Sequence, residues 1–283
     1  MSRILDLAHT VTTDATTEFA TETGSAEVAI TVLAVAAAMF AAGIVLRGRA
    51  RLSVALRAGG LALAFAVLAV QVHDAGWLTG RDGPVTSWFV AHRTSTLDGV
   101  AVAVTNLGSP AATVALAVVV AGLLAWRAHS LIPAVVLIGT VGAASAASTV
   151  LKVLIGRDRP SAAVQKIVET DHSFPSGHVT GTATLLAMIV VIAAAGRSRR
   201  VRAALAVVTT LVVVLVAATR VYLGVHWLTD VVGGALLAAF FATLGAAVLH
   251  ELTERAGSRR RPQGVVEEAS VAAVASSRAG TPL

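Results

Sequence analysis

The sequence predicts an all-α protein, a polytopic membrane helix bundle, and three observations lead to this prediction. Hydrophobic residues occupy 56% of the 283 positions and charged residues only 13%, whereas charged residues make up about a quarter of a typical soluble domain. The apolar residues fall into seven long stretches rather than amphipathic patterns. Arg and Lys lie mainly between these stretches. Helices without a polar face need lipid as their solvent.

Each apolar stretch is close to the ~20 residues that a helix needs to cross the hydrocarbon core. We place the seven spans at 27–46, 54–72, 110–126, 131–151, 179–195, 203–219 and 229–249. The stretch at 73–109 is too polar to span, and we expect a short amphipathic helix along the membrane surface there. Residues 1–26 form a polar N-terminal segment without the pattern of a signal peptide.

The distribution of Arg and Lys predicts the orientation of the chain. If the spans alternate, 14 of the 22 basic residues fall on one side, in the connections after the first, third and fifth spans and in the C-terminal tail. The positive-inside rule assigns this side to the cytoplasm. We therefore expect an inner (plasma) membrane protein with its N-terminus outside and with residues 251–283 as a disordered cytoplasmic tail.

Composition also excludes several classes of function. The chain has no cysteine, so disulfides, iron–sulfur clusters and thiol chemistry are excluded. The net charge of +6 would suit nucleic acid, but the basic residues form no stripe with interleaved aromatic residues. We expect no nucleic-acid partner.

Five of the eight remaining basic residues crowd around the outer ends of spans four, five and six, which indicates an anionic ligand. They are Lys152, Arg157, Arg159, Lys166 and Arg220.

Three motifs lie at these outer ends. Lys152 and Arg159-Pro160 follow span four, and their spacing of seven would place both side chains on one face of a helix. Pro175-Ser176-Gly177-His178 opens span five. The third motif contains Arg220, His226 and Asp230, and its His and Asp are four apart, so the carboxylate can receive a ring N–H on a helix.

These residue types meet the needs of phosphoryl transfer, in which the phosphate oxygens are bound, a nucleophile is aimed in line and the leaving oxygen is protonated. Lys152, Arg159 and Arg220 supply three cations. Pro175 at a helix start would leave the backbone N–H groups of Ser176 and Gly177 free for an anion. Two histidines remain, one to attack and one to protonate.

Lys-x6-Arg-Pro, Pro-Ser-Gly-His and Arg-x5-His-x3-Asp, in this order between membrane spans, resemble the signature of the type 2 phosphatidic acid phosphatase superfamily. That family also includes soluble vanadium haloperoxidases and acid phosphatases. The resemblance covers about residues 54–250, the expected phosphatase-like membrane domain with six family spans. Residues 27–53 would add one extra N-terminal span and a cytoplasmic loop.

The resemblance implies a role for each matching residue. His226 would be the nucleophile that forms a phosphohistidine, and Asp230 would orient its ring. His178 would protonate the leaving group and then activate water. The phosphoryl oxygens would be bound by Lys152, Arg159, Ser176, Gly177 and Arg220. The resemblance implies no metal and no cofactor. The family's third motif usually opens with Ser-Arg, whereas this chain has Thr219-Arg220.

The expected substrate is a phosphorylated lipid, with phosphatidic acid, phosphatidylglycerol phosphate and polyprenyl diphosphate, such as undecaprenyl diphosphate, as candidates. Two alternatives stay open at this point: a lipid phosphotransferase that uses the same site, and an anion carrier or sensor without chemistry. Arg157 could contact a second phosphate or lie in a solvated loop, and Asp171 and His172 are expected in an exposed loop.

Overall fold

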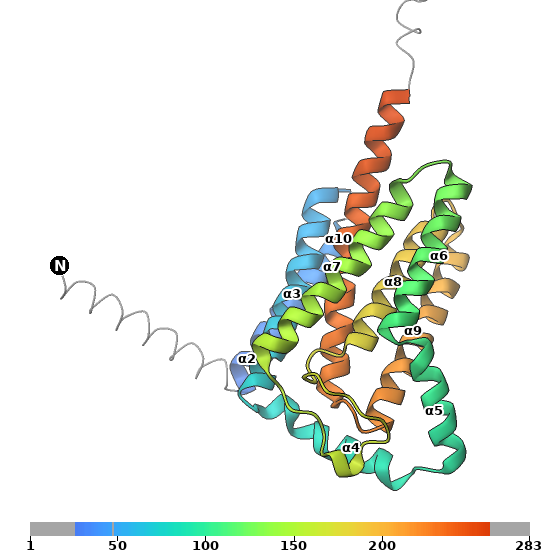
Figure 1. Cartoon of the computed structure of the whole chain (residues 1–283). Coiled ribbons are helices and arrows are strands. Elements are labelled where there is room, and N and C mark those ends of the chain that lie inside the picture. The colour runs from blue at the N-terminus through green and yellow to red at the C-terminus, as the bar shows by residue number, and fades with distance from the viewer. Residues whose placement is uncertain (1–25, 47, 261–283) are drawn as a thin grey trace, which may run out of the picture.

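The computed structural model describes residues 26–46 and 48–260, and these ranges contain helices and no strand (Figure 1). The predicted all-α membrane bundle is therefore confirmed. The polar N-terminal segment up to residue 25 lies outside the described residues. The helices are α2 (Ala26–Val45), α3 (Ala50–His73), α4 (Asp82–Ala91), α5 (Ser95–Leu107), α6 (Pro110–Ala128), α7 (Ile132–Ile155), α8 (Gly177–Ala193), α9 (Arg199–Tyr222) and α10 (Leu228–Arg260), with short 3-10 turns η1 (Trp77–Arg81) and η2 (Ala162–Val164).

Each of the seven predicted spans corresponds to a helix. Within the described ranges, six helices are long and apolar enough to cross a membrane: α2, α3, α6, α7, α9 and α10. The seventh, α8, is apolar but has only 17 residues, about 25 Å of helix. It packs against α6, α7, α9 and α10. Because α8 is surrounded by protein, the loops at its ends can enter the bundle without exposing backbone groups to lipid.

The first span, α2, packs against α3 through small residues. Ala29, Ala36 and Gly43 are the buried residues of α2. A Cβ at Gly60 in α3 would lie 2.5 Å from the carbonyl oxygen of Ala36, so only glycine fits there. The hydroxyl of Ser53 donates to the carbonyl of Gly43 at 2.6 Å. Such close packing and interhelical hydrogen bonds hold helices together in lipid, where no hydrophobic force does so.

The polar stretch between α3 and α6 forms η1, α4 and α5 rather than one helix. α4 packs against α9 and α10, and α5 packs against α9. Figure 1 shows α4, α5 and the long connection between α7 and α8 at the same end of the bundle. The polar segments of the chain therefore gather where α7 and α9 end and where α8 and α10 begin.

The last helix, α10, extends beyond the other helices of the bundle (Figure 1). Its 33 residues make about 50 Å of helix. The sequence predicted a disordered tail from residue 251, whereas residues 251–260 are helical. Glu251 and Arg255, one turn apart, form an ion pair at 2.7 Å that stabilises this exposed part of the helix. The rest of the predicted tail, 261–283, lies outside the described residues.

Candidate active site

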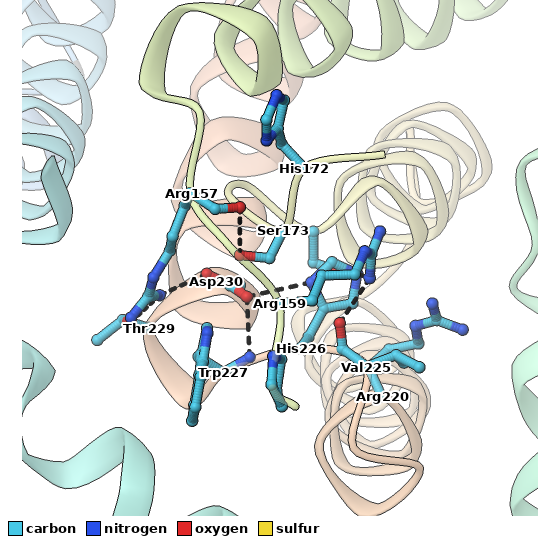
Figure 2. A network of polar contacts seen from close by, with 12 residues as sticks. Arg157, Arg159, His172, Ser173, Arg220, Val225, His226, Trp227, Thr229 and Asp230 are labelled. Carbon is cyan, nitrogen blue, oxygen red and sulfur yellow. Dashed lines mark hydrogen bonds and ion pairs between the residues drawn. The ribbon is translucent and has the colours of Figure 1, made fainter. Parts of the chain in front are cut away.

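The eight residues predicted for the site lie at helix ends and in loops at the polar end of the bundle. Figure 2 shows Arg159, Arg220, His226 and Asp230 among them. Alternation of the spans brings together the ends of helices that are far apart in the sequence. The site residues come from the last turn of α7 (Lys152), the loop that follows it (Arg159), the start of α8 (Ser176, Gly177, His178), the last turn of α9 (Arg220), the connection to α10 (His226) and the first turn of α10 (Asp230).

Two adjacent glycines let α10 approach the start of α8. A Cβ at Gly233 would lie 2.5 Å from a ring carbon of Phe174, and a Cβ at Gly234 would lie 2.7 Å from the carbonyl oxygen of Ser176. The N–H of Ser176 donates to the carbonyl of Asp230 at 3.0 Å. Direct backbone contact therefore fixes the two segments that carry the histidines.

His226 is held by a carboxylate on one side of its ring. Its Nδ1 lies 3.2 Å from Oδ2 of Asp230, which also accepts the N–H of Trp227 at 2.8 Å. His226 and Asp230 are both fully buried. The other ring nitrogen, Nε2, lies 3.3 Å from Nη1 of Arg159. When Nδ1 carries the ring proton and donates it to Asp230, the lone pair of Nε2 points toward the cations of the site.

The electrostatic surroundings of His226 favour its neutral form. Burial has the largest effect, and the charges of Arg220, Arg159 and Lys152 add to it, so the pKa of His226 lies well below its ordinary value. A neutral imidazole carries the lone pair that a nucleophile needs.

The ring of His178 lies next to Arg220 as the ring of His226 lies next to Arg159. Its Nε2 lies 3.3 Å from Nη1 of Arg220, which also donates to Thr105 Oγ1 at 2.9 Å. The second terminal nitrogen of Arg220 forms an ion pair with Glu169. Arg220 is fully buried, and its Nε has no hydrogen-bond partner among the described residues. Each histidine thus presents Nε2 to an arginine.

Two carboxylates of the α7–α8 loop contact all three predicted phosphate-binding cations. Asp171 lies 3.1 Å from Nζ of Lys152 and 2.5 Å from Nη2 of Arg159. Glu169 pairs with Arg220 and lies 3.9 Å from Arg159. Three positive and two negative side chains therefore form one cluster with a net positive charge.

The cations keep both carboxylates ionised. Partial burial raises the pKa of Asp171, but Lys152 and Arg159 outweigh this effect and lower the pKa to about 2. Burial also raises the pKa of Glu169, and Arg220 outweighs it, so this pKa lies below its usual value. Asp171 was expected in an exposed loop, and its side chain is indeed 56% exposed, yet it links two cations of the site.

The geometry inferred for the first motif was wrong. Lys152 and Arg159 do not share a helix face, because α7 ends at Ile155 and Gly156 follows with a φ of +65°. Glycine adopts this left-handed conformation without strain and ends the helix there. Arg159 lies in the loop, where it also donates to the carbonyls of Asp171 and Val225. Loop contacts, rather than helical spacing, bring the two cations together.

The inferred anion site at the start of α8 also needs correction. Ser176 occupies the N-cap position of α8 without a side-chain capping bond, and its N–H donates to the Asp230 carbonyl, so this N–H is not free. The hydroxyl of Ser176 is buried and has no partner within the described part of the chain. Gly177 begins the helix, and a Cβ there would lie 3.9 Å from Cε of Lys152. Both residues therefore lie beside the cations, and Ser176 offers its hydroxyl instead of its amide.

Sequence reasoning missed Asp82 and the contacts of Arg157, which was expected either to contact a second phosphate or to lie in a solvated loop. Arg157 donates to Asp230 Oδ1 at 2.5 Å and to Asp82 Oδ2 at 2.6 Å, and its side chain is largely buried. The only signal for Arg157 was its place among the basic residues near span four. Nothing in the sequence pointed to Asp82, which lies 75 positions earlier in a segment expected on the membrane surface.

Thr219, where the family usually has Ser, turns its hydroxyl onto the carbonyl of Val216 at 2.7 Å. This bond lies within α9 and does not involve the site residues. Either hydroxyl amino acid can make it.

No group of three or more His, Cys, Asp and Glu residues in 26–46 and 48–260 is arranged to hold a metal ion. The carboxylates Glu169 and Asp171 face cationic side chains instead.

Comparisons with known proteins agree on one family. The family model of the PAP2 superfamily matches residues 133–254. Phosphatidylglycerophosphatase B of Bacillus subtilis (strain 168) is 30% identical over 177 residues, which cover 62% of this chain and 85% of that protein. The crystal structure of a transmembrane PAP2 type phosphatidylglycerolphosphate phosphatase from Bacillus subtilis matches with a TM-score of 0.60 and 25% identity, over 72% of this chain and 98% of the other. The structure of Aquifex aeolicus LpxE matches with a TM-score of 0.47 and 21% identity, over 58% and 93% of the two chains.

The helical membrane bundle and these relatives define a multi-pass membrane phosphatase. The chain belongs to the PAP2 superfamily, the type 2 phosphatidic acid phosphatases, and is a lipid phosphatase of that type.

Proposed function

We propose that this protein hydrolyses the terminal phosphate of a membrane lipid, a monoester or a pyrophosphate, through a phosphohistidine on His226 and without a metal ion. The position of the His226 ring carries the proposal: Nδ1 is held by Asp230 while Nε2 faces Arg159 and the cation cluster.

In the first step, Nε2 of His226 attacks the phosphorus and the bond to the leaving oxygen breaks. The leaving group takes a proton from the protonated form of His178. In the second step, His178 accepts a proton from water, the water oxygen attacks the phosphorus, and the P–N bond breaks. Inorganic phosphate leaves and both histidines return to their starting forms.

The cations Lys152, Arg159 and Arg220 would bind the phosphoryl oxygens, with the Ser176 hydroxyl and the start of α8 at Gly177. Fixed positive groups around the oxygens lower the cost of the charge that is redistributed in the transition state. The carboxylates of Glu169 and Asp171 would exchange their contacts with these cations for contacts with the phosphate. Three cations supply the charge that a metal ion supplies in other phosphatases.

The substrate is proposed to be phosphatidic acid, phosphatidylglycerol phosphate or a polyprenyl diphosphate. The matching sequence and the matching crystal structure from Bacillus subtilis are both named for phosphatidylglycerol phosphate, which makes this lipid the first to test. We further propose that the protein lies in the inner (plasma) membrane with its N-terminus outside, its C-terminus in the cytoplasm and the site at the outer face. The positive-inside distribution of Arg and Lys supports this orientation.

The test is phosphate release by the purified full-length protein in detergent with EDTA, on each of the three lipids. We expect release that is lost in His226→Ala. Persistence of full turnover in that variant would exclude His226 as the nucleophile. Activity that disappears in EDTA and returns only with magnesium would contradict the metal-free mechanism. Formation of a new phosphoester in place of inorganic phosphate would show that the same site acts as a phosphotransferase.

A further inference from the structure

Asp230 uses its two carboxylate oxygens for different partners. Oδ2 faces Nδ1 of His226 and the N–H of Trp227, whereas Oδ1 accepts Nη1 of Arg157 at 2.5 Å. Figure 2 shows Arg157 beside Asp230 and Thr229. A carboxylate bound at both oxygens is fixed in rotation, and so is the ring that it holds.

Arg157 is itself held by a second buried carboxylate. Its Nη2 donates to Oδ2 of Asp82 at 2.6 Å, and its Nη1 also donates to the hydroxyl of Thr229 at 2.7 Å. Asp82 in turn accepts the N–H of Thr229 at 2.9 Å and its hydroxyl at 2.6 Å. The guanidinium lies 5.6 Å from the ring centroid of Trp227. These contacts join α4, the α7–α8 loop and the start of α10.

The contacts with Arg157 and Thr229 explain why the carboxylate of Asp82 can be buried. Asp82 begins α4 and is only 3% exposed, and a buried carboxylate is costly unless it is paired and hydrogen-bonded. Arg157 and Thr229 provide the pairing. The structure thus carries two carboxylates, one facing His226 and one behind it, with one arginine between them.

We propose that Arg157 is a positioning residue of the phosphatase: it holds Asp230, and through Asp230 the ring of His226, in the orientation for attack, and Asp82 holds Arg157. The inference rests on the proposed role of His226 as the nucleophile. It assigns different roles to two arginines that are two positions apart. Arg159 is one of the proposed phosphate-binding cations and faces Nε2 of His226, whereas Arg157 contacts Asp230 behind the Asp–His pair.

The experiment compares Arg157→Gln, Arg157→Lys and Asp82→Asn in the purified full-length protein, with Arg81→Gln as an exposed neighbouring control. It measures kcat and KM for a lipid monophosphate and a lipid diphosphate, competitive inhibition by vanadate, and thermal stability in detergent. For Arg157→Gln we expect kcat to fall by about 100-fold, because a small misplacement of the reacting group costs about that much. KM and vanadate inhibition should stay within about twofold for both substrates, since no phosphate contact is lost.

Arg157→Lys should recover part of kcat, because one ammonium group cannot reproduce the fork that binds two carboxylates. Asp82→Asn keeps the side-chain shape and should lower kcat alone, to a smaller extent, and it carries the test if Arg157→Gln does not fold. Wild-type kcat in both single variants, Asp82→Asn and Arg157→Lys, would overturn the inference. So would a rise in KM and loss of vanadate binding in Arg157→Gln, above all for the diphosphate, because that result would make Arg157 a phosphate ligand.

Measuring His226→Ala in the same experiment distinguishes a failure of the positioning role of Arg157 from a failure of the proposed function, in which His226 is the nucleophile. Loss of turnover in His226→Ala with wild-type kcat in the Arg157 variants rejects the positioning role alone. Turnover that survives in His226→Ala rejects the proposed function itself.

Discussion

Nε2 of His226 lies 3.3 Å from Nη1 of Arg159, on the opposite side of the ring from Asp230. The nitrogen that can attack therefore faces the positive group that would bind the phosphate, and the nitrogen that carries the proton faces the carboxylate. His178 shows a corresponding relationship with Arg220. The two histidines differ in their second ring nitrogen: among the described residues, only His226 has a carboxylate bonded there, with Asp230 at 3.2 Å from Nδ1.

This difference predicts distinct defects for the two histidines. His226→Ala should lower kcat by at least about 10³-fold for every substrate, because no phosphoenzyme can form. His178→Ala should fail with lipid substrates, whose alkoxide needs a proton, but should still react with a p-nitrophenyl ester, whose leaving group does not. The second variant should then accumulate phosphohistidine, because it lacks the base that activates water.

Acid-labile phosphate on the protein, measured after rapid quenching, tests this expectation. Accumulation of phosphoenzyme in His226→Ala would assign the nucleophile elsewhere. Equal rates for the lipid and the p-nitrophenyl ester in His178→Ala would remove the proposed acid role.

The lowered pKa of His226 predicts the pH dependence of phosphoenzyme formation. Burial and the charges of Arg220, Arg159 and Lys152 hold this pKa well below 6.5, so the neutral ring should persist as the pH falls through 6.5. The fall of kcat/KM on the acid side of its pH profile, the acid limb, should accordingly lie below pH 6.5. The titration of the substrate phosphate, measured by ³¹P NMR, is first corrected for. Removing one positive charge in Arg159→Gln should raise the pKa and move the limb to higher pH. A corrected limb at 6.5 or above in the wild type, or no movement in the variant, would contradict this assignment.

The close approach of α10 to the start of α8 predicts a strong effect of a single methyl group. In Gly234→Ala the added Cβ would meet the carbonyl oxygen of Ser176 at 2.7 Å, and a backbone atom cannot move aside without displacing the Pro-Ser-Gly-His segment. We expect a loss of about 1–3 kcal/mol of stability and a fall in activity. Gly139→Ala is the matched control, since its Cβ would meet nothing within 4 Å in α7. Thermal unfolding in detergent and kcat measure both effects, and equal behaviour of the two variants would refute the packing argument.

The spans and the gathering of the three motifs could be predicted because both follow from local sequence. The length of each apolar stretch predicts a membrane-spanning helix. Because successive spans alternate in direction, the helix ends that carry Lys152, Ser176 and Asp230 lie on one side of the bundle. The relation between Lys152 and Arg159 was mispredicted because the sequence spacing assumes a helix that Gly156 ends. The partnership of Asp82 with Arg157 depends on tertiary packing between segments 75 positions apart, and no local pattern encodes it.

The contact of Asp171 with Lys152 and Arg159 predicts competition between this carboxylate and phosphate. Asp171 lies 3.1 Å from Lys152 and 2.5 Å from Arg159, and phosphate would need the same donors. Asp171→Asn should therefore strengthen inhibition by inorganic phosphate and vanadate. Because the Asp171 side chain is 56% exposed, solvent screens its ion pairs, and we expect a gain of about twofold to fivefold in affinity.

Asp158→Asn provides the matched control, because Asp158 is an exposed acid of the same loop whose substitution changes the local charge equally. Inhibition constants at two salt concentrations separate a direct contact from a diffuse field, since a field effect of the loop would appear in both variants and weaken with salt. A gain confined to Asp171→Asn would show that the carboxylate occupies the phosphate-binding cations. Weaker phosphate binding in Asp171→Asn would instead show that Asp171 holds Lys152 and Arg159 in position for the phosphate.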